Sequence, residues 1–139
     1  MACDLQFTHS SGMKIKGFTK IAEVNPKMCE DMFGCKKAYV GFSGNADVWS
    51  NVVVWLDNPE GKPPKCRGLE MLLLTDKGHI YHGTNLTNWM RLNEEFFSIG
   101  AGMQYAMTAM SLGKSPKEAV LVASKYDPNT GMGAKEYKV

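Results

Sequence analysis

The chain lacks several features that would assign it quickly to a class of protein. Its four cysteines include no Cys-x-x-Cys pair, so neither a zinc knuckle nor a thioredoxin-like site is predicted, and we expect free thiols. No apolar run approaches the ~18 residues of a membrane-spanning helix. The first residues have neither the basic flank nor the long apolar stretch of a signal peptide. These absences predict a cytoplasmic protein.

The chain also carries only a small excess of positive over negative charge. The formal net charge is only +2, the lysines are scattered, and Lys36-Lys37 is the one tandem basic pair. A nucleic-acid-binding face normally needs a clustered basic patch with interleaved aromatic residues. We therefore do not expect nucleic acid to be the partner.

Two patterns that invite a metal assignment do not fit one. His79 and His82 stand three apart on an expected strand, so they point to opposite faces and cannot share an ion. Residues 127–131 have some of the spacing of a calcium loop, but the glycine comes one place early and Lys138 stands where a bidentate glutamate is required. We expect neither a metal nor another cofactor.

The composition is that of one globular domain. The chain has 139 residues, of which 44% are hydrophobic and 22% charged, close to the average for folded domains. No repeat or linker interrupts it, so we expect a single domain over residues 1–139.

The hydrophobic pattern predicts strands mixed with helices. Alternation predicts strands that pair as a hairpin over 2–8 and 13–24, β-forming residues predict another over 37–43, and a continuous apolar run predicts one buried on both faces over 71–75. After a turn at 76–78 the chain returns as a strand over 79–82, and further short strands are expected within 84–99. Residues 134–139 could form a last edge strand, whereas 28–35 are expected to be a loop or turn.

The helices carry clearer boundary signals. Asn45 is a good N-cap for a helix over 46–56. Ser115, with proline after it and Glu118 three places on, predicts a capping box for the last helix. A helix over 102–112 is apolar nearly all round, so we expect it to be covered on all sides. Strands alternating with paired helices indicate a layered α+β sandwich.

Ordered segments resemble one family. A-x-D-x-Q-x-T over 2–8 followed by KG-x-x-KI over 16–21 resembles the second and third strands of bacterial HslV and proteasome β-subunits. YVGFSGNAD over 39–47 resembles the family's strand into its first helix. SIGAG-x-x-YA over 98–106 and SP-x-EA over 115–119 resemble its later helix pair. The set spans nearly the whole chain and looks most like the short HslV-like proteins of phage genomes.

The resemblance implies a four-layer αββα sandwich and the chemistry of an N-terminal nucleophile. In such enzymes a terminal threonine attacks a peptide carbonyl and its own amine acts as the base. By position, Asp4 matches the orienting aspartate, Lys20 the catalytic lysine and Gly44 the oxyanion glycine. Asp127 and Thr130 match an Asp-x-x-Ser pair beside the nucleophile.

Two departures from the family pattern predict a loss of activity. Ala101 stands where the family usually has a serine, and only three residues precede Asp4, so the first strand with its nucleophile is not in the sequence. Cys3 does not replace the nucleophile, because it alternates to the face opposite Asp4 and removal of Met1 would leave Ala2 at the terminus. Asp4 and Lys20 are then expected to be a structural ion pair.

Three functional hypotheses follow. The first is a non-catalytic HslV-like protein, truncated at the first strand, that acts through self-assembly and binding of a host protein, peptide or ligand, as a phage factor would. Its relatives form closed rings, and a lost first strand would leave an edge that recruits another strand. The second is an active threonine-type peptidase whose true N-terminus lies upstream. The third is a protein that sequesters a ligand in the cleft around Asp4, Lys20 and Gly44.

Overall fold

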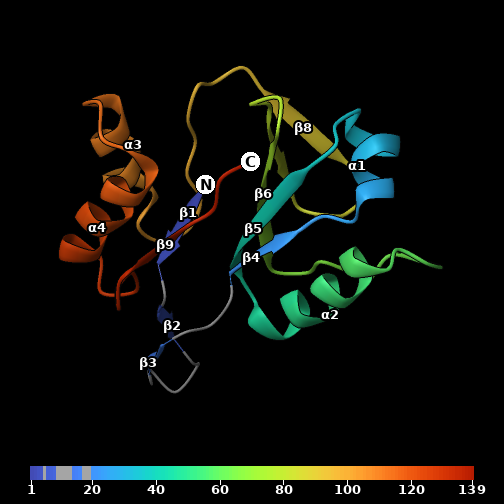
Figure 1. Ribbon diagram of the computed structural model, residues 1–139. Coiled ribbons are helices and arrows are strands. Elements are labelled where there is room, and N and C mark those ends of the chain that lie inside the picture. The colour runs from blue at the N-terminus through green and yellow to red at the C-terminus, as the bar shows by residue number, and fades with distance from the viewer. Residues whose placement is uncertain (5, 9–13, 17–19) are drawn as a thin grey trace. The chain divides into compact units, whose positions relative to one another are not determined.

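The computed structural model describes residues 1–4, 6–8, 14–16 and 20–139 (Figure 1). The chain folds into two compact units. The first unit comprises Met1–Lys20 with Phe96–Lys138, and the second comprises Ile21–Glu95 with Val139. The single domain over 1–139 therefore stays a prediction. No helix among the described residues is long and apolar enough to cross a membrane.

The second unit is built on a five-stranded antiparallel sheet with the order β4-β5-β6-β7-β8. Its strands are β4 (Ile21–Glu23), β5 (Ala38–Gly44), β6 (Leu69–Thr75), β7 (Ile80–Gly83) and β8 (Trp89–Leu92). The strand predicted over 37–43 and the turn before β7 are both present. Of the strands expected within 84–99, the structure has β8 only.

Two helices cover one face of this sheet. Phe42 of β5 stacks on Trp49 of α2 (Ala46–Asp57), and Phe33 of α1 (Pro26–Phe33) packs edge-on against Tyr81 of β7. The register places Phe42 and Tyr81 on the same side of the sheet. Burial in β6 alternates accordingly, with Met71 buried and its neighbours only half-buried. The helix-facing side of β6 is therefore buried, whereas burial of its second face stays a prediction.

Helix α1 replaces the loop predicted over 28–35. Asn25 accepts a hydrogen bond from the Lys27 N–H, proline occupies the first turn, and Gly34 in the left-handed region ends the helix. These are ordinary start and stop signals for a short helix. Helix α2 follows the sequence prediction more closely, since the Asn45 side chain accepts from two backbone N–H groups at its start.

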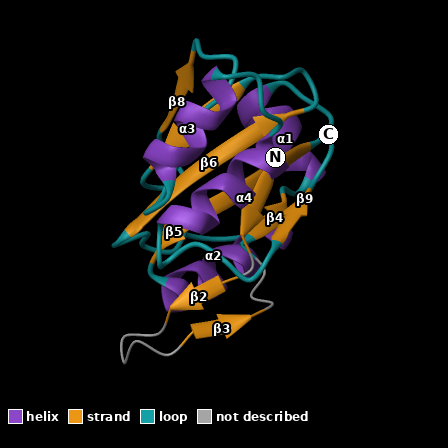
Figure 2. Ribbon diagram, turned by 90° about the vertical axis from the view of Figure 1, so that its left-hand side faces the viewer, coloured by secondary structure: helices purple, strands orange, loops and turns teal. Residues whose placement is uncertain are grey.

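The first unit contains a pair of helices and two small two-stranded sheets. Strand β1 (Ala2–Asp4) pairs antiparallel with β9 (Ala134–Glu136), as Figure 1 shows. Strand β2 (Gln6–Thr8) pairs antiparallel with β3 (Lys14–Lys16), as Figure 2 shows. Among the described residues, the hairpin predicted from 2–8 and 13–24 is present as β2 and β3. Strand β4 pairs with β5 of the five-stranded sheet instead, and residues 5, 9–13 and 17–19 lie outside the described part.

Helices α3 (Met103–Ser111) and α4 (Pro116–Tyr126) pack on each other through alanines. Their shared core consists of Ala106, Ala109, Ala119 and Ala123. The capping box predicted at Ser115 and Glu118 is formed in full. The predicted burial of the helix over 102–112 on all sides is wrong, because Tyr105 is 42% exposed. Because the alanine side chains are small, α4 approaches the alanine face of α3 closely. The longer side chains of α3 lie away from this face.

Candidate functional site

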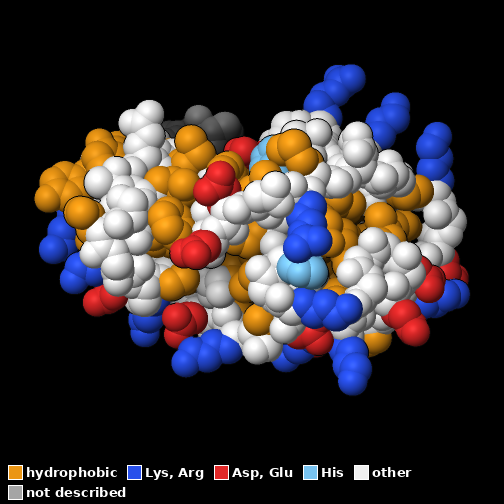
Figure 3. Space-filling view, turned by 90° about the horizontal axis from the view of Figure 1, so that it is seen from above, with side chains coloured by type: hydrophobic (Ala, Val, Ile, Leu, Met, Phe, Trp, Pro, Cys, Tyr) orange, Lys and Arg blue, Asp and Glu red, His pale blue; other side chains and the backbone are white. Residues whose placement is uncertain are grey.

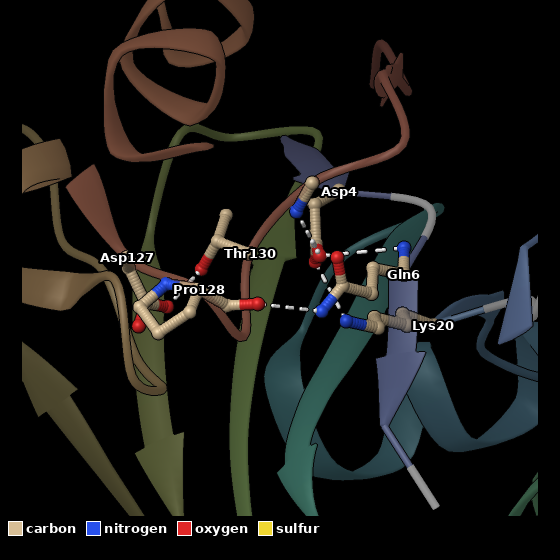
Figure 4. A network of polar contacts seen from close by, with 7 residues as sticks. Asp4, Gln6, Lys20, Asp127, Pro128 and Thr130 are labelled. Carbon is tan, nitrogen blue, oxygen red and sulfur yellow. Dashed lines mark hydrogen bonds and ion pairs between the residues drawn. The ribbon is translucent and has the colours of Figure 1, made fainter. Parts of the chain in front are cut away.

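An ion pair between Asp4 and Lys20 is the centre of the candidate site (Figure 4). Lys20 Nζ lies 2.6 Å from Asp4 Oδ1, and the side chains are only 18% and 11% exposed. Strand β1 positions the aspartate, and Lys20 directly precedes β4. Because both groups are largely removed from water, each depends on the other more than a surface pair would.

The second carboxylate oxygen of Asp4 is also fully engaged. The backbone N–H of Gly131 donates to Asp4 Oδ2 at 3.0 Å, and the N–H of Gln6 donates to the same oxygen at 3.3 Å. The carboxylate thus accepts from one ammonium and two backbone amides. Such a set of charge-assisted hydrogen bonds holds the side chain in one orientation.

Gln6 links this carboxylate to the loop after α4. Its side-chain amide donates to the carbonyl of Pro128 at 2.9 Å. A Cβ added at Gly131 would lie 2.9 Å from Gln6 Oε1, so the glycine leaves room for the glutamine. The chain therefore closes around Asp4 from two regions distant in sequence.

Asp127 and Thr130 form a contact of their own in the same loop. The Thr130 hydroxyl donates to Asp127 Oδ2, and Asp127 is buried. A Cβ added at Gly102, just before α3, would lie 2.7 Å from Thr130 Oγ1. The start of α3 thus packs directly on this threonine. Both residues lie in the network of Figure 4, but their expected role beside a nucleophile stays a prediction.

Gly44 has a clear structural reason to be glycine. Its φ is +113°, and a Cβ there would lie 2.0 Å from the carbonyl oxygen of Gly68. Only glycine tolerates both the backbone angle and the close approach. Gly44 ends β5 in the second unit, whereas Asp4 and Lys20 belong to the first. Its expected role as an oxyanion glycine stays a prediction.

Cys3 is a poor nucleophile in this environment. Burial raises the pKa of its thiol, although the charge of Lys20 acts in the opposite direction. A thiol with a raised pKa is protonated at neutral pH and reacts slowly. The Met1 amine donates to the Tyr137 carbonyl at 2.8 Å, extending the pairing of β1 with β9. Burial also lowers the pKa of that amine.

Ala101 lies in the turn before α3 and is exposed. A methyl group can neither donate nor accept a hydrogen bond, so this position cannot supply the polar contact that a serine would. Among the described residues, no cluster of three or more His, Cys, Asp or Glu side chains could hold a metal ion.

Three members of the network were not predicted from sequence as site residues: Gln6, Pro128 and Gly131. Gln6 belonged to the motif over 2–8 but received no role. Gly131 supplies a backbone group, which residue-type patterns do not reveal. The one signal in the sequence was the DPNTG run, in which the loop after α4 turns back toward β9.

Solved structures with the same fold support the family resemblance. The chain is similar to Thiobacillus denitrificans BPH, with 14% identity and a TM-score of 0.73, over 98% of this chain and 89% of BPH. BPH in complex with epoxomicin matches with 16% identity and a TM-score of 0.63, over 98% and 89% of the two chains. Eukaryotic HslV from Trypanosoma brucei matches with 14% identity and a TM-score of 0.62, over 96% and 88%. No protein-family profile and no curated protein matches.

The chain therefore has the mixed α/β fold of the HslV/proteasome β-type Ntn hydrolases. The fold class predicted from the sequence is confirmed. At these identities the likeness is one of fold, and the activity of the neighbours does not transfer with it.

Proposed function

We propose that this chain is a non-catalytic protein of the HslV/proteasome β type that acts through self-assembly and by binding a partner protein, peptide or small ligand. A phage origin, a host-protein target and a place in the host cytoplasm are part of the same proposal. They rest on the sequence resemblance to short phage proteins.

The observation that carries the non-catalytic role is the saturation of Asp4. Its two oxygens accept from Lys20, Gln6 and Gly131. All three bonds are internal to the chain, and the one from Gly131 holds β1 against the loop after α4. A set of this kind has a structural use whether or not a nucleophile stands beside it.

The exposed apolar face of α3 and α4 supports assembly. Tyr105 stacks on Tyr126 at 5.4 Å, and the surface also contains Met103, Leu112 and Leu121. Leu112 is 78% exposed and Tyr126 is 64% exposed. Hydrophobic side chains gather at the left of Figure 3, the side on which Figure 1 shows α3 and α4. Exposed apolar side chains gathered on a helix pair are typical of protein interfaces.

The charged surface favours a protein or ligand partner over a nucleic acid. Figure 3 shows Asp and Glu side chains as well as Lys and Arg side chains on the face in view, and the formal net charge is only +2. A strong basic field, which nucleic-acid binding generally requires, does not arise from such a distribution.

The alternative function is an active threonine-type peptidase with its nucleophile upstream of Met1. The observation in its favour is that the Asp4–Lys20 pair, which the family resemblance assigns to proton transfer, is intact and well ordered by hydrogen bonds. The ligand-sequestering hypothesis uses the same pair to bind an anionic or carbonyl group through the Lys20 ammonium.

The decisive experiment measures the native terminus and the activity together. We expect the native protein to have no Thr, Ser or Cys nucleophile at its terminus by intact mass, to hydrolyse no fluorogenic peptide above buffer, and to show no thermal shift with epoxomicin. A native terminus at an upstream Thr, Ser or Cys, with turnover that Lys20→Met abolishes, would establish the peptidase instead. Thermal shift with a panel of peptides and nucleotides tests sequestration.

Assembly has its own test with a matched control. Light scattering after size exclusion should show an oligomer that Leu121→Glu dissociates. Val54→Glu is the control, because Val54 is 73% exposed on α2 of the second unit and lies outside the proposed surface. A monomeric wild-type protein, or equal effects of the two variants, would contradict this surface.

A further inference from the structure

Two buried thiols lie side by side at the end of α1. Cys29 is 0% exposed and Cys35 is 4% exposed. Cys35 Sγ lies 3.5 Å from the carbonyl oxygen of Cys29, and the Cys35 N–H donates to that same oxygen at 3.1 Å. The two thiols are close enough that each influences the pKa of the other.

The backbone explains why residues six apart meet here. Gly34 ends α1 with a φ of +58°, a left-handed conformation that turns the chain back across the last turn of the helix. Cys35 is thereby returned over Cys29. The helix end is itself well anchored, because Phe33 packs against Tyr81 and Trp89.

The pair takes no part in the features described so far. It belongs to the second unit, whereas the Asp4–Lys20 site and the assembly surface belong to the first. It has no third ligand for a metal, since the described part of the chain holds no cluster of three or more ligating side chains.

We propose that Cys29 and Cys35 are a covalent modification site at which a hydroperoxide or a small-molecule disulfide forms an intrachain disulfide. With a hydroperoxide ROOH, one thiolate is oxidised to a sulfenic acid and ROH leaves. The second thiol then displaces water as the S–S bond forms. With a small disulfide, the first thiolate forms a mixed disulfide and the second expels the remaining thiol. In both routes the two sulfurs together lose two electrons and two protons.

Burial sets the rate of this reaction. It raises the pKa of Cys29 to about 12 and also raises the pKa of Cys35. The reactive thiolate is therefore scarce at neutral pH, so oxidation is slow and accelerates as the pH rises. Once formed, the bond is covered from reductants by the same packing that slows its formation. It closes a short loop and restricts the unfolded chain, so it stabilises the folded state.

Trypsin provides a direct readout, because cleavage after Lys27 and Lys36 leaves both cysteines in one peptide over residues 28–36. The folded protein is exposed to hydrogen peroxide or oxidised glutathione at neutral and raised pH. It is then alkylated under denaturing conditions and digested. We expect the 28–36 peptide to lose two hydrogen atoms in mass and to escape alkylation, faster at the higher pH, and the oxidised protein to melt several degrees higher.

Cys66 provides the matched control, since it is also buried but lies in a different loop. Cys66→Ser should leave the modified 28–36 peptide unchanged, whereas Cys35→Ser should abolish it. The inference is overturned if the linked peptide forms only after urea unfolds the wild-type protein, if Cys29 or Cys35 bonds to Cys66 instead, or if oxidation lowers the melting temperature. None of these outcomes depends on whether the Asp4–Lys20 site is catalytic.

Discussion

Replacing Asp4 by asparagine should destabilise the protein more than replacing Lys20 by methionine. The two residues form a single ion pair, so a pairwise view would expect equal losses. The structure predicts asymmetry because Asp4 accepts three hydrogen bonds and Lys20 donates one of them. The number of groups left unsatisfied, rather than the pair itself, should decide the loss.

The magnitude follows from those groups. Asp4→Asn removes the charge facing a largely buried ammonium, and the new amide must turn its NH₂ toward either Lys20 or the two backbone N–H groups. At roughly 1–3 kcal/mol for each donor left without an acceptor, the loss should be about 2–4 kcal/mol. Lys20→Met leaves the carboxylate with both backbone donors, so it should cost only about 1–2 kcal/mol after allowing for partial exposure of the pair.

Urea denaturation at pH 7 followed by far-UV circular dichroism measures both losses. The wild-type protein, the two single variants and the double variant should be compared. Their free energies of unfolding should fall with urea concentration at the same slope, so that a change in midpoint reports a change in stability. Asp31→Asn is the control, because this exposed aspartate on α1 should change the free energy of unfolding by no more than about 0.5 kcal/mol. The reasoning is refuted if Lys20→Met costs as much as Asp4→Asn.

Three further predictions concern backbone and thiol chemistry. Gly44→Ala should lower the free energy of unfolding by more than about 3 kcal/mol, because the added Cβ would clash with the Gly68 carbonyl. The control is Gly113→Ala, which has φ +86° but open space around it and should cost only about 1 kcal/mol. Equal costs in thermal or urea unfolding would contradict the clash. Met132→Gly should stabilise by roughly 0.5–1 kcal/mol, since Met132 has φ +60°; a lower melting temperature would contradict this. The Cys29 pKa is raised from 9.0 to about 12, so the unfolded chain loses this proton first. Stability should therefore fall between pH 9 and 12 by about 1.4 kcal/mol per unit, and an unchanged slope in Cys29→Ala would refute the assignment.

The sequence predicted helix boundaries well where a side chain caps backbone groups a few residues away. The caps of α2 and α4 depend on Asn45, Ser115 and Glu118, and each acts on backbone groups within three residues. Helix α1 was missed although Asn25 and Gly34 carry equally local signals. There the apolar spacing over eight residues was too short to distinguish a helix from a turn.

Long-range pairing could not be predicted in the same way. The pairing of β1 with β9 joins residues more than a hundred places apart, and a three-residue strand has too little alternation to select its partner. The partners of Asp4 illustrate the same limit. Lys20 was identified through the family resemblance, whereas Gly131 contributes only its backbone N–H, which any residue type except proline could donate.

The saturation of Asp4 also bears on whether the Asp4–Lys20 pair indicates catalytic activity. A residue retained only for proton transfer has no effect on folding, so mutation would remove it once the nucleophile was gone. Asp4 instead joins β1 to Lys20 and to the loop after α4, and its replacement is expected to cost a substantial part of the roughly 5–15 kcal/mol that stabilises a typical domain. Selection for folding alone would then preserve the pair. The presence of Asp4 and Lys20 is consequently weak evidence for activity, and the chemical identity of the native N-terminus carries the greater weight.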